Sequence, residues 1–76
     1  KLSVYPNPTF ETVTISVENF ESADLQVFDL GGKLLVSEKN ISPVNHTVDL
    51  SALNPGLYII KLSSATQSVS GRLVKN

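Results

Sequence analysis

The feature that most constrains the fold is the stretch of residues 50–62, where a turn signal runs directly into a strand signal. Pro55 fixes its φ near the value needed at the second position of a tight turn, and Gly56 accepts a positive φ without steric cost. The following residues, 57–62, form the run that is richest in strand-forming side chains. The sequence therefore predicts a tight turn at residues 54–56 that feeds a strand.

Tyr58 follows this turn at the head of the predicted strand. A tyrosine in such a place can donate its hydroxyl to upstream backbone across the corner of a sandwich, an arrangement known as a tyrosine corner. We therefore predict that Tyr58 bonds back to the turn and fixes the register of its strand.

Alternating apolar residues elsewhere predict more strands and no helix. Residues 12–17 alternate strictly, with Val13, Ile15 and Val17 on one face and hydroxyl residues on the other. Similar runs predict strands at residues 1–5, 24–28, 33–37, 44–50 and 69–75. Their predicted inward residues include Leu25, Val27, Leu34, Val36, Val44, His46, Val48 and Leu50. The chain is thus predicted to be all-β, a seven-stranded antiparallel immunoglobulin-like β-sandwich in a single domain, residues 1–76.

The string from Asp29 to Gly32 predicts a hairpin turn with two possible geometries. One is a two-residue turn with a positive φ at both glycines. The other is a type I turn that starts at Asp29, with Gly32 in the left-handed region and a bulge. We predict the second, because the Asp29 carboxylate can cap it.

Pro6 and Pro8 flank Asn7 and interrupt the first strand pattern. Two prolines so close together remove two backbone donors and hold the chain extended. We interpret them as a kink where the chain leaves the sheet, in preference to a ligand for proline-recognition domains.

Composition excludes several kinds of chemistry. The 76 residues contain no cysteine, which rules out disulfides, thiolate metal sites and a thiol nucleophile. A net charge of −1 does not favour nucleic acid or an anionic membrane as a partner. The sequence also has no methionine, so we expect it to be a piece of a longer or processed protein.

The residues that could perform catalysis are few and scattered. His46 is the sole histidine, and it alternates in phase with Val44 and Val48, which favours a hydrogen-bonded structural role. Asp29 and Asp49 each border a turn, where capping is the simpler account. We therefore expect no catalytic site, no cofactor, no metal and no small-molecule substrate.

Two surfaces are candidates for binding a partner. Some apolar residues oppose the predicted core faces and are either covered by loops, the interpretation that we favour, or available to a partner: Leu57, Ile59, Phe28, Leu30 and Leu35. The terminal strand is the second candidate, because it is short and basic and its backbone could pair with a strand of a receptor.

Five stretches, taken in order, resemble one known family. They are residues 5–8, 13–16, 25–35, 49–62 and 71–75, and they include Tyr-Pro-Asn-Pro at the start and Asn-Pro-Gly-Leu-Tyr in the predicted corner. In this order and spacing they resemble the type A C-terminal sorting domain of cargo of the type IX (Por) secretion system.

The resemblance implies a non-catalytic signal that directs a passenger across the outer membrane. The implied partners are outer-membrane translocation and shuttle proteins, and a sortase-like peptidase that cuts upstream of the domain before the passenger is anchored. The implied location is the periplasm, in transit to the cell surface or extracellular space of a Gram-negative bacterium. It assigns recognition by the translocation machinery to Gly71, Arg72, Leu73, Val74, Lys75 and Asn76. It makes fold signatures of Tyr5, Pro6, Asn7, Pro8, Asp29, Gly32, Pro55, Gly56 and Tyr58.

Two other functions are weighed against this one. A carbohydrate-binding or adhesive β-sandwich module would need a row of exposed aromatic side chains, whereas the aromatic residues here are scattered and include no tryptophan. An immunoglobulin-like spacer without a partner is the remaining alternative.

Overall fold

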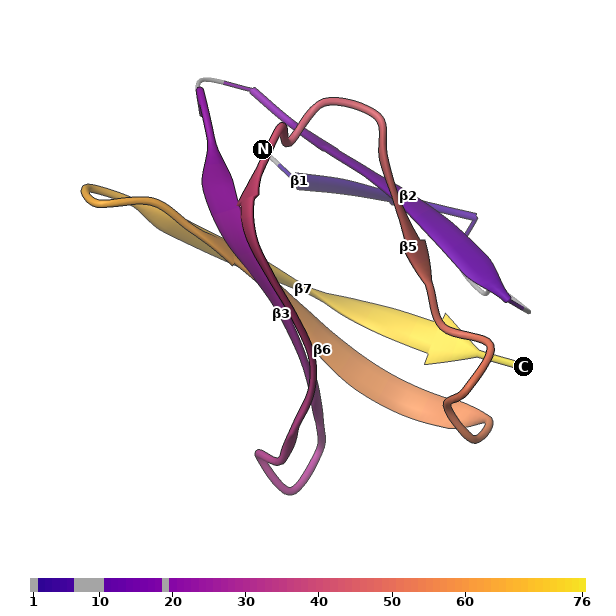
Figure 1. Ribbon diagram of the computed structural model, residues 1–76. Coiled ribbons are helices and arrows are strands. Elements are labelled where there is room, and N and C mark those ends of the chain that lie inside the picture. The colour runs from indigo at the N-terminus through magenta and orange to yellow at the C-terminus, as the bar shows by residue number, and fades with distance from the viewer. Residues whose placement is uncertain (1, 7–10, 19) are drawn as a thin grey trace.

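The computed structural model describes residues 2–6, 11–18 and 20–76, and in them it contains seven strands and no helix (Figure 1). The strands are β1 (Leu2–Tyr5), β2 (Thr12–Val17), β3 (Ala23–Asp29), β4 (Leu34–Ile41), β5 (His46–Asp49), β6 (Gly56–Ser63) and β7 (Ser68–Lys75). Sheet A has the strand order β1-β2-β5 and sheet B has the order β4-β3-β6-β7. Every strand pair is antiparallel. The predicted all-β fold of seven antiparallel strands is thus confirmed.

The core lies between the two sheets, which Figure 1 shows as separate layers. The strict alternation of β2 holds as predicted, because Val13, Ile15 and Val17 are all buried. Ile60 and Leu62 of β6 meet them from sheet B. Burying an aliphatic side chain of this size is worth about 1.5–3 kcal/mol. This shared core determines which face of each strand is exposed to solvent.

The hairpin between β3 and β4 corrects one prediction about the core. Leu34, predicted to face inward, is 45% exposed, and Leu35, predicted to face outward, packs against the core. The cause is a shift of register: Val27 lies opposite Val36, whereas Phe28 lies opposite Leu34. Leu35 is therefore an extra residue in a bulge, and such a residue exchanges the faces of its neighbours.

The strand predicted at residues 44–50 is shorter than expected. Val44, predicted to face the core, is 57% exposed, and β5 begins only at His46. Asn45 has a φ of 54°, in the left-handed region, which breaks the alternation between Val44 and His46. The preceding strand, β4, extends instead to Ile41.

Two contacts close the open sides of the sandwich. On one side Nε2 of His46 lies 2.6 Å from Oε1 of Glu38, which joins β5 of sheet A to β4 of sheet B. His46 thus has the predicted hydrogen-bonded structural role. On the other side β1 lies along β7, and a Cβ added at Gly71 would be 3.3 Å from Cδ2 of Leu2. A side chain at Gly71 would therefore require the Leu2 side chain to shift by a few tenths of an ångström.

Within the described residues, no helix is long and apolar enough to cross a membrane.

Candidate partner-binding surfaces

The predicted recognition segment, residues 71–76, is the end of β7, an edge strand of sheet B. Successive side chains of a strand point to opposite faces. Leu73 is fully buried and Lys75 is only 8% exposed, whereas Arg72, Val74 and Asn76 are exposed. The segment therefore has an inward set that holds the strand and an outward set that a partner can contact.

Lys75 illustrates what the sequence interpretation missed. The sequence predicts a basic terminal strand, and its two cations, Arg72 and Lys75, are three residues apart and lie on opposite faces. Lys75 turns inward with Leu73, at the point where β7 pairs with Gly56. A lysine can bury its aliphatic stem in this way. The period of two was a sufficient signal to separate the two side chains.

The tyrosine corner at the start of β6 forms as predicted, but the hydrogen-bonded turn lies earlier than the predicted residues 54–56: the amide of Leu53 donates to the carbonyl of Leu50, and Gly56 is already part of β6. Tyr58 is buried, and its hydroxyl donates a hydrogen bond to the backbone carbonyl of Asn54. Gly56 has a φ of 159°, close to the extended region, and already pairs with β7 through Lys75. The corner thus ties the start of β6 to the end of the terminal strand.

The turn between β3 and β4 adopts the predicted type I geometry. The amide of Gly32 donates to the carbonyl of Asp29 (3.1 Å), and Gly32 has a φ of 90°. Oδ1 of Asp29 accepts hydrogen bonds from the amides of Gly31 and Lys33, both at 2.9 Å. The predicted capping role of Asp29 is confirmed.

Asp49 has a similar local role at the end of β5. Its Oδ1 accepts a hydrogen bond from the amide of Ser51 at 2.9 Å. This bond, with a smaller contribution from the Ser51 side chain, lowers the pKa of Asp49. The carboxylate caps a turn, as predicted.

The opening fold signature lies partly outside the described residues. Tyr5 ends β1 and donates its hydroxyl to Oδ1 of Asn45 at 2.9 Å, and the bond between Tyr5 and Pro6 is cis. Asn7 and Pro8 fall outside the described part of the chain. β1 does end immediately before Pro6.

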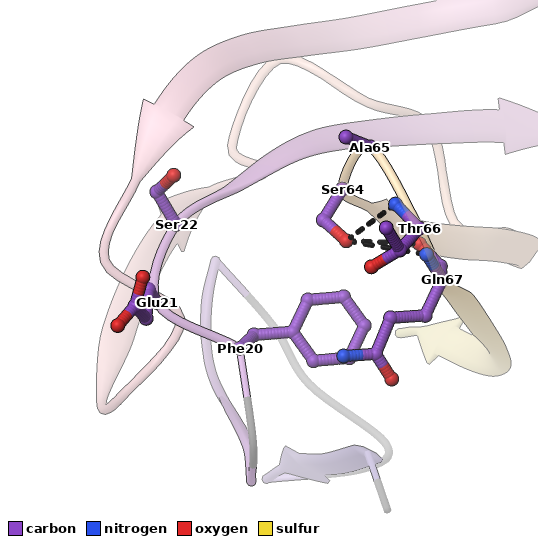
Figure 2. A pocket seen from close by; sticks show the side chains of 7 residues that line it. All are labelled: Phe20, Glu21, Ser22, Ser64, Ala65, Thr66 and Gln67. Atoms are coloured by element: carbon purple, nitrogen blue, oxygen red, sulfur yellow. Dashed lines mark hydrogen bonds between the residues drawn. The ribbon is translucent and has the colours of Figure 1, made fainter.

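An open hollow lies at one end of the sandwich, between the β2–β3 connection and the β6–β7 turn (Figure 2). Phe20 points across it toward Thr66 and Gln67, and Oγ of Ser64 accepts hydrogen bonds from the amides of those two residues at 3.4 and 3.3 Å. Its lining has one carboxylate, that of Glu21, and no histidine. The groups gathered here do not form an acid–base pair or an activated nucleophile.

The described residues also contain no group of three or more histidine, aspartate or glutamate side chains that could hold a metal ion.

The outer face of sheet B is apolar at one end. Directly paired residues of an antiparallel sheet share a face. Phe28 pairs with both Leu34 and Ile59, and Leu57 pairs with Val74. Leu34, Leu57 and Val74 are exposed, and Phe28 and Ile59 are half-buried. We call these five residues the apolar stripe.

The stripe partly matches the outward apolar residues predicted from the sequence. Leu57, Ile59 and Phe28 belong to it, and Leu30 is exposed in the adjoining turn. Leu35 does not belong, because the bulge turns it toward the core and puts Leu34 in its place. Val74 was singled out only as part of the terminal strand, although its alternation with the inward Leu73 signals an outward position.

The outer face of sheet A is mainly polar, with the ring of Tyr5 as the large exposed apolar group among its described residues. Thr14 pairs with Tyr5 on one side and Thr47 on the other. Ser3 pairs with Ser16, and Thr12 pairs with Asp49. These side chains give sheet A a face of hydroxyl groups, which is typical of a solvated sheet surface.

Comparison with known proteins identifies the family. The sequence model of the family described as "Secretion system C-terminal sorting domain" matches residues 3–76. The chain is 32% identical over 68 residues to ulvan lyase NLR42 of Nonlabens ulvanivorans, which is 90% of this chain and 13% of that protein. It is 31% identical over 75 residues to beta-agarase D of Zobellia galactanivorans, which is 97% of this chain and 15% of that protein. The chain thus spans about a seventh of the length of these relatives.

Domains of this family are signals carried by secreted cargo, and a sorting signal is in general non-catalytic. Such cargo is destined for the cell surface or the extracellular space. The match over residues 3–76, together with the ordered stretches of the sequence and the all-β fold, shows that the chain belongs to the family of type IX secretion system C-terminal sorting domains and is a secretion signal.

Proposed function

We propose that residues 1–76 act as one non-catalytic unit that carries an attached passenger from the periplasm across the outer membrane. The family match over residues 3–76 is the observation that carries this proposal. The unit is a ligand for the outer-membrane translocation and shuttle proteins and needs no cofactor. A sortase-like peptidase then cuts upstream of the domain, and the passenger is anchored at the cell surface.

The recognition element in this proposal is the outward side of the end of β7. Gly71, Leu73 and Lys75 are turned toward the sandwich and serve to hold the strand in place. Arg72, Val74 and Asn76 are exposed and are the side chains that a receptor reads. An edge strand at the limit of a sheet is a common docking element for protein partners.

The carbohydrate-binding alternative receives no support from the described aromatic side chains. Tyr58 is buried in the core, and Phe28 and Phe20 are half-buried and lie on different parts of the molecule. Tyr5 is 45% exposed, but no second described aromatic ring lies beside it on the outer face of sheet A. A sugar-binding face usually offers aromatic rings in a row. Phe10 lies outside the described residues.

Export of a fusion protein tests the proposal. Residues 1–76 are fused to a periplasmic reporter in a host that has the type IX machinery, and reporter at the cell surface is measured. We expect export of the intact fusion and none after deletion of residues 73–76. Because that deletion also removes the buried Leu73, a second variant, Arg72→Ser with Asn76→Ser, changes only exposed side chains and should reduce export.

The outcomes separate the two parts of the proposal. If the intact fusion stays in the periplasm, the sorting function is wrong. If the intact fusion and both altered fusions reach the surface equally well, the end of β7 is not the recognition element.

A further inference from the structure

The apolar stripe lies beside the proposed recognition strand and continues from it across sheet B. Val74 of β7 pairs with Leu57 of β6, and the next row joins Ile59 to Phe28. Leu34 of β4 completes that row at the far edge of the sheet. The stripe therefore crosses all the strands of sheet B, from one edge to the other.

Apolar side chains of the stripe are exposed to solvent although the core of the sandwich does not need them. Leu57 is 36% exposed and Val74 is 38% exposed, although both lie within paired strands. Contiguous exposed apolar side chains on a small domain commonly mark a site of protein contact. The sandwich core does not need them, because the opposite side of each of these strands already supplies it.

Positive charge lies next to the stripe on the same face. Arg72 pairs with Ile59, and Lys61 pairs with Ser70 in the following row. Both side chains are exposed. Charge complementarity across protein interfaces sets the choice of partner and the rate of encounter. A surface with apolar side chains beside carboxylates is the complement of this face.

From these observations we infer that the apolar stripe, with Arg72 and Lys61, docks a folded partner protein whose contact surface combines apolar side chains and carboxylates. The inference rests on the proposed function, since it takes this partner to be a component of the export machinery. It extends the contact beyond the exposed side chains of the last strand to the outer face of sheet B. A patch of five apolar side chains and two cations is small, and small interfaces are typical of contacts that form and then release.

The stripe can be altered without touching the core. Leu34→Thr, Leu57→Thr and Val74→Thr together replace exposed apolar side chains with a residue that still favours strands. Val44→Thr is the matched control, because Val44 is also exposed but lies in the connection between β4 and β5. We expect the triple variant to reduce export of the reporter roughly tenfold or more, which corresponds to about 1.4 kcal/mol of lost contact energy. We expect the control to be exported like the parent fusion.

The charge component has its own variant. Lys61→Glu with Arg72→Glu reverses both cations and should reduce export as well, because like charges then face the carboxylates of the partner. Lys39→Glu makes one such reversal at an exposed position of β4, away from the paired rows of the stripe, and should leave export unchanged.

Photocrosslinking in the exporting cells identifies what occupies the stripe. A photoreactive phenylalanine derivative is placed at position 57 and, as a control, at position 14 on the outer face of sheet A. We expect a crosslink to an envelope protein from position 57 that is lost with the charge-reversed variant, and none from position 14.

Three results would overturn the inference while leaving the proposed function in place. One is normal export of the triple variant while the intact fusion is exported, which leaves the sorting function standing but removes the stripe, and with it Val74 from the proposed recognition element. Another is a crosslink from position 57 whose mass is twice that of the fusion, which would mean that a second copy occupies the stripe. The third is equal crosslinking from positions 57 and 14. Failure of the intact fusion to be exported would remove the proposed function and the inference together.

Discussion

The two outer faces of this sandwich are built by the same rule but present opposite chemistry. Sheet A offers hydroxyl groups in its central row, formed by Tyr5, Thr14 and Thr47. The corresponding place on sheet B is occupied by Phe28, Ile59 and Arg72. Both faces lie opposite a fully packed core, so core packing does not account for the difference.

The difference supports the proposal that a partner protein docks on the outer face of sheet B. A small sandwich gains stability from its inner residues, and its outer residues are free to be polar. Sheet A uses this freedom to face water, whereas sheet B keeps apolar side chains exposed beside the terminal strand. The outer face of sheet B, which carries the proposed recognition strand, is thus also the more apolar of the two outer faces.

The largest expected effect is the difference in stability between substitutions on the inward and on the outward side of β7. Leu73→Ala should lower the free energy of unfolding by about 2–5 kcal/mol, because it leaves a cavity among fully buried neighbours. The neighbouring change Val74→Thr should alter it by less than about 0.5 kcal/mol, because that side chain is on the surface. Urea unfolding of the two variants measures both values. Equal losses of unfolding free energy in the two variants would show that Leu73 and Val74 do not differ in burial as the structure indicates.

Tyr58→Phe should have a smaller effect, about 1 kcal/mol, because it removes the hydrogen bond to the carbonyl of Asn54 and keeps the buried ring. Leu57→Thr, on the outward side of the same strand, is the control and should change the stability less. Thermal unfolding of the two variants tests this order. A Tyr58→Phe variant as stable as the parent would mean that the corner contributes packing alone.

Periodicity in the sequence predicted most of the fold, because a period of two is a direct consequence of strand geometry. It placed Val13 and Ile15 in the core correctly, and it allowed the corner at Tyr58 and the turn at Asp29 to be predicted from local chemistry. The pairing of strands into sheets A and B needed the structure, since it depends on contacts between distant segments.

The two mistakes about inward residues share one physical cause. An extra residue at Leu35 and a left-handed residue at Asn45 each shift the alternation by one, so Leu34 and Val44 turn outward. The residue types at these positions do not signal a bulge or a positive φ strongly enough to be predicted. The apolar stripe was only partly foreseen for the same reason, because Leu34 joins it through the bulge.

Making sheet A resemble sheet B tests whether apolar surface alone is sufficient for recognition. Thr14→Val with Ser16→Val adds apolar side chains to the outer face of sheet A at strand-compatible positions. We expect stability within about 0.5 kcal/mol of the parent and unchanged export of the fusion, because the partner contacts sheet B. Export through the altered face, seen as recovery of the triple stripe variant when these two changes are added, would contradict this expectation.

The smallest effect concerns the charge on the outer face of sheet A. Asp49 lies there opposite Thr12, and its pKa is lowered from the usual 3.8, first by the backbone hydrogen bond from Ser51 and then by the Ser51 side chain. A carboxyl whose pKa is lower in the folded state stabilises the fold above its unfolded pKa, and this contribution is lost as the pH falls through the folded pKa. Asp49→Asn should therefore be less stable than the parent at pH 7, and the difference should shrink below about pH 4.

Urea midpoints at pH 7, 4 and 2.5 measure the change, with Ser51→Ala as a control that keeps the backbone donor and hence most of the pH dependence. A difference between Asp49→Asn and the parent that stays constant over this range would show that the carboxylate charge does not support the turn, and the contrast in charge between the two faces would then have no consequence for folding.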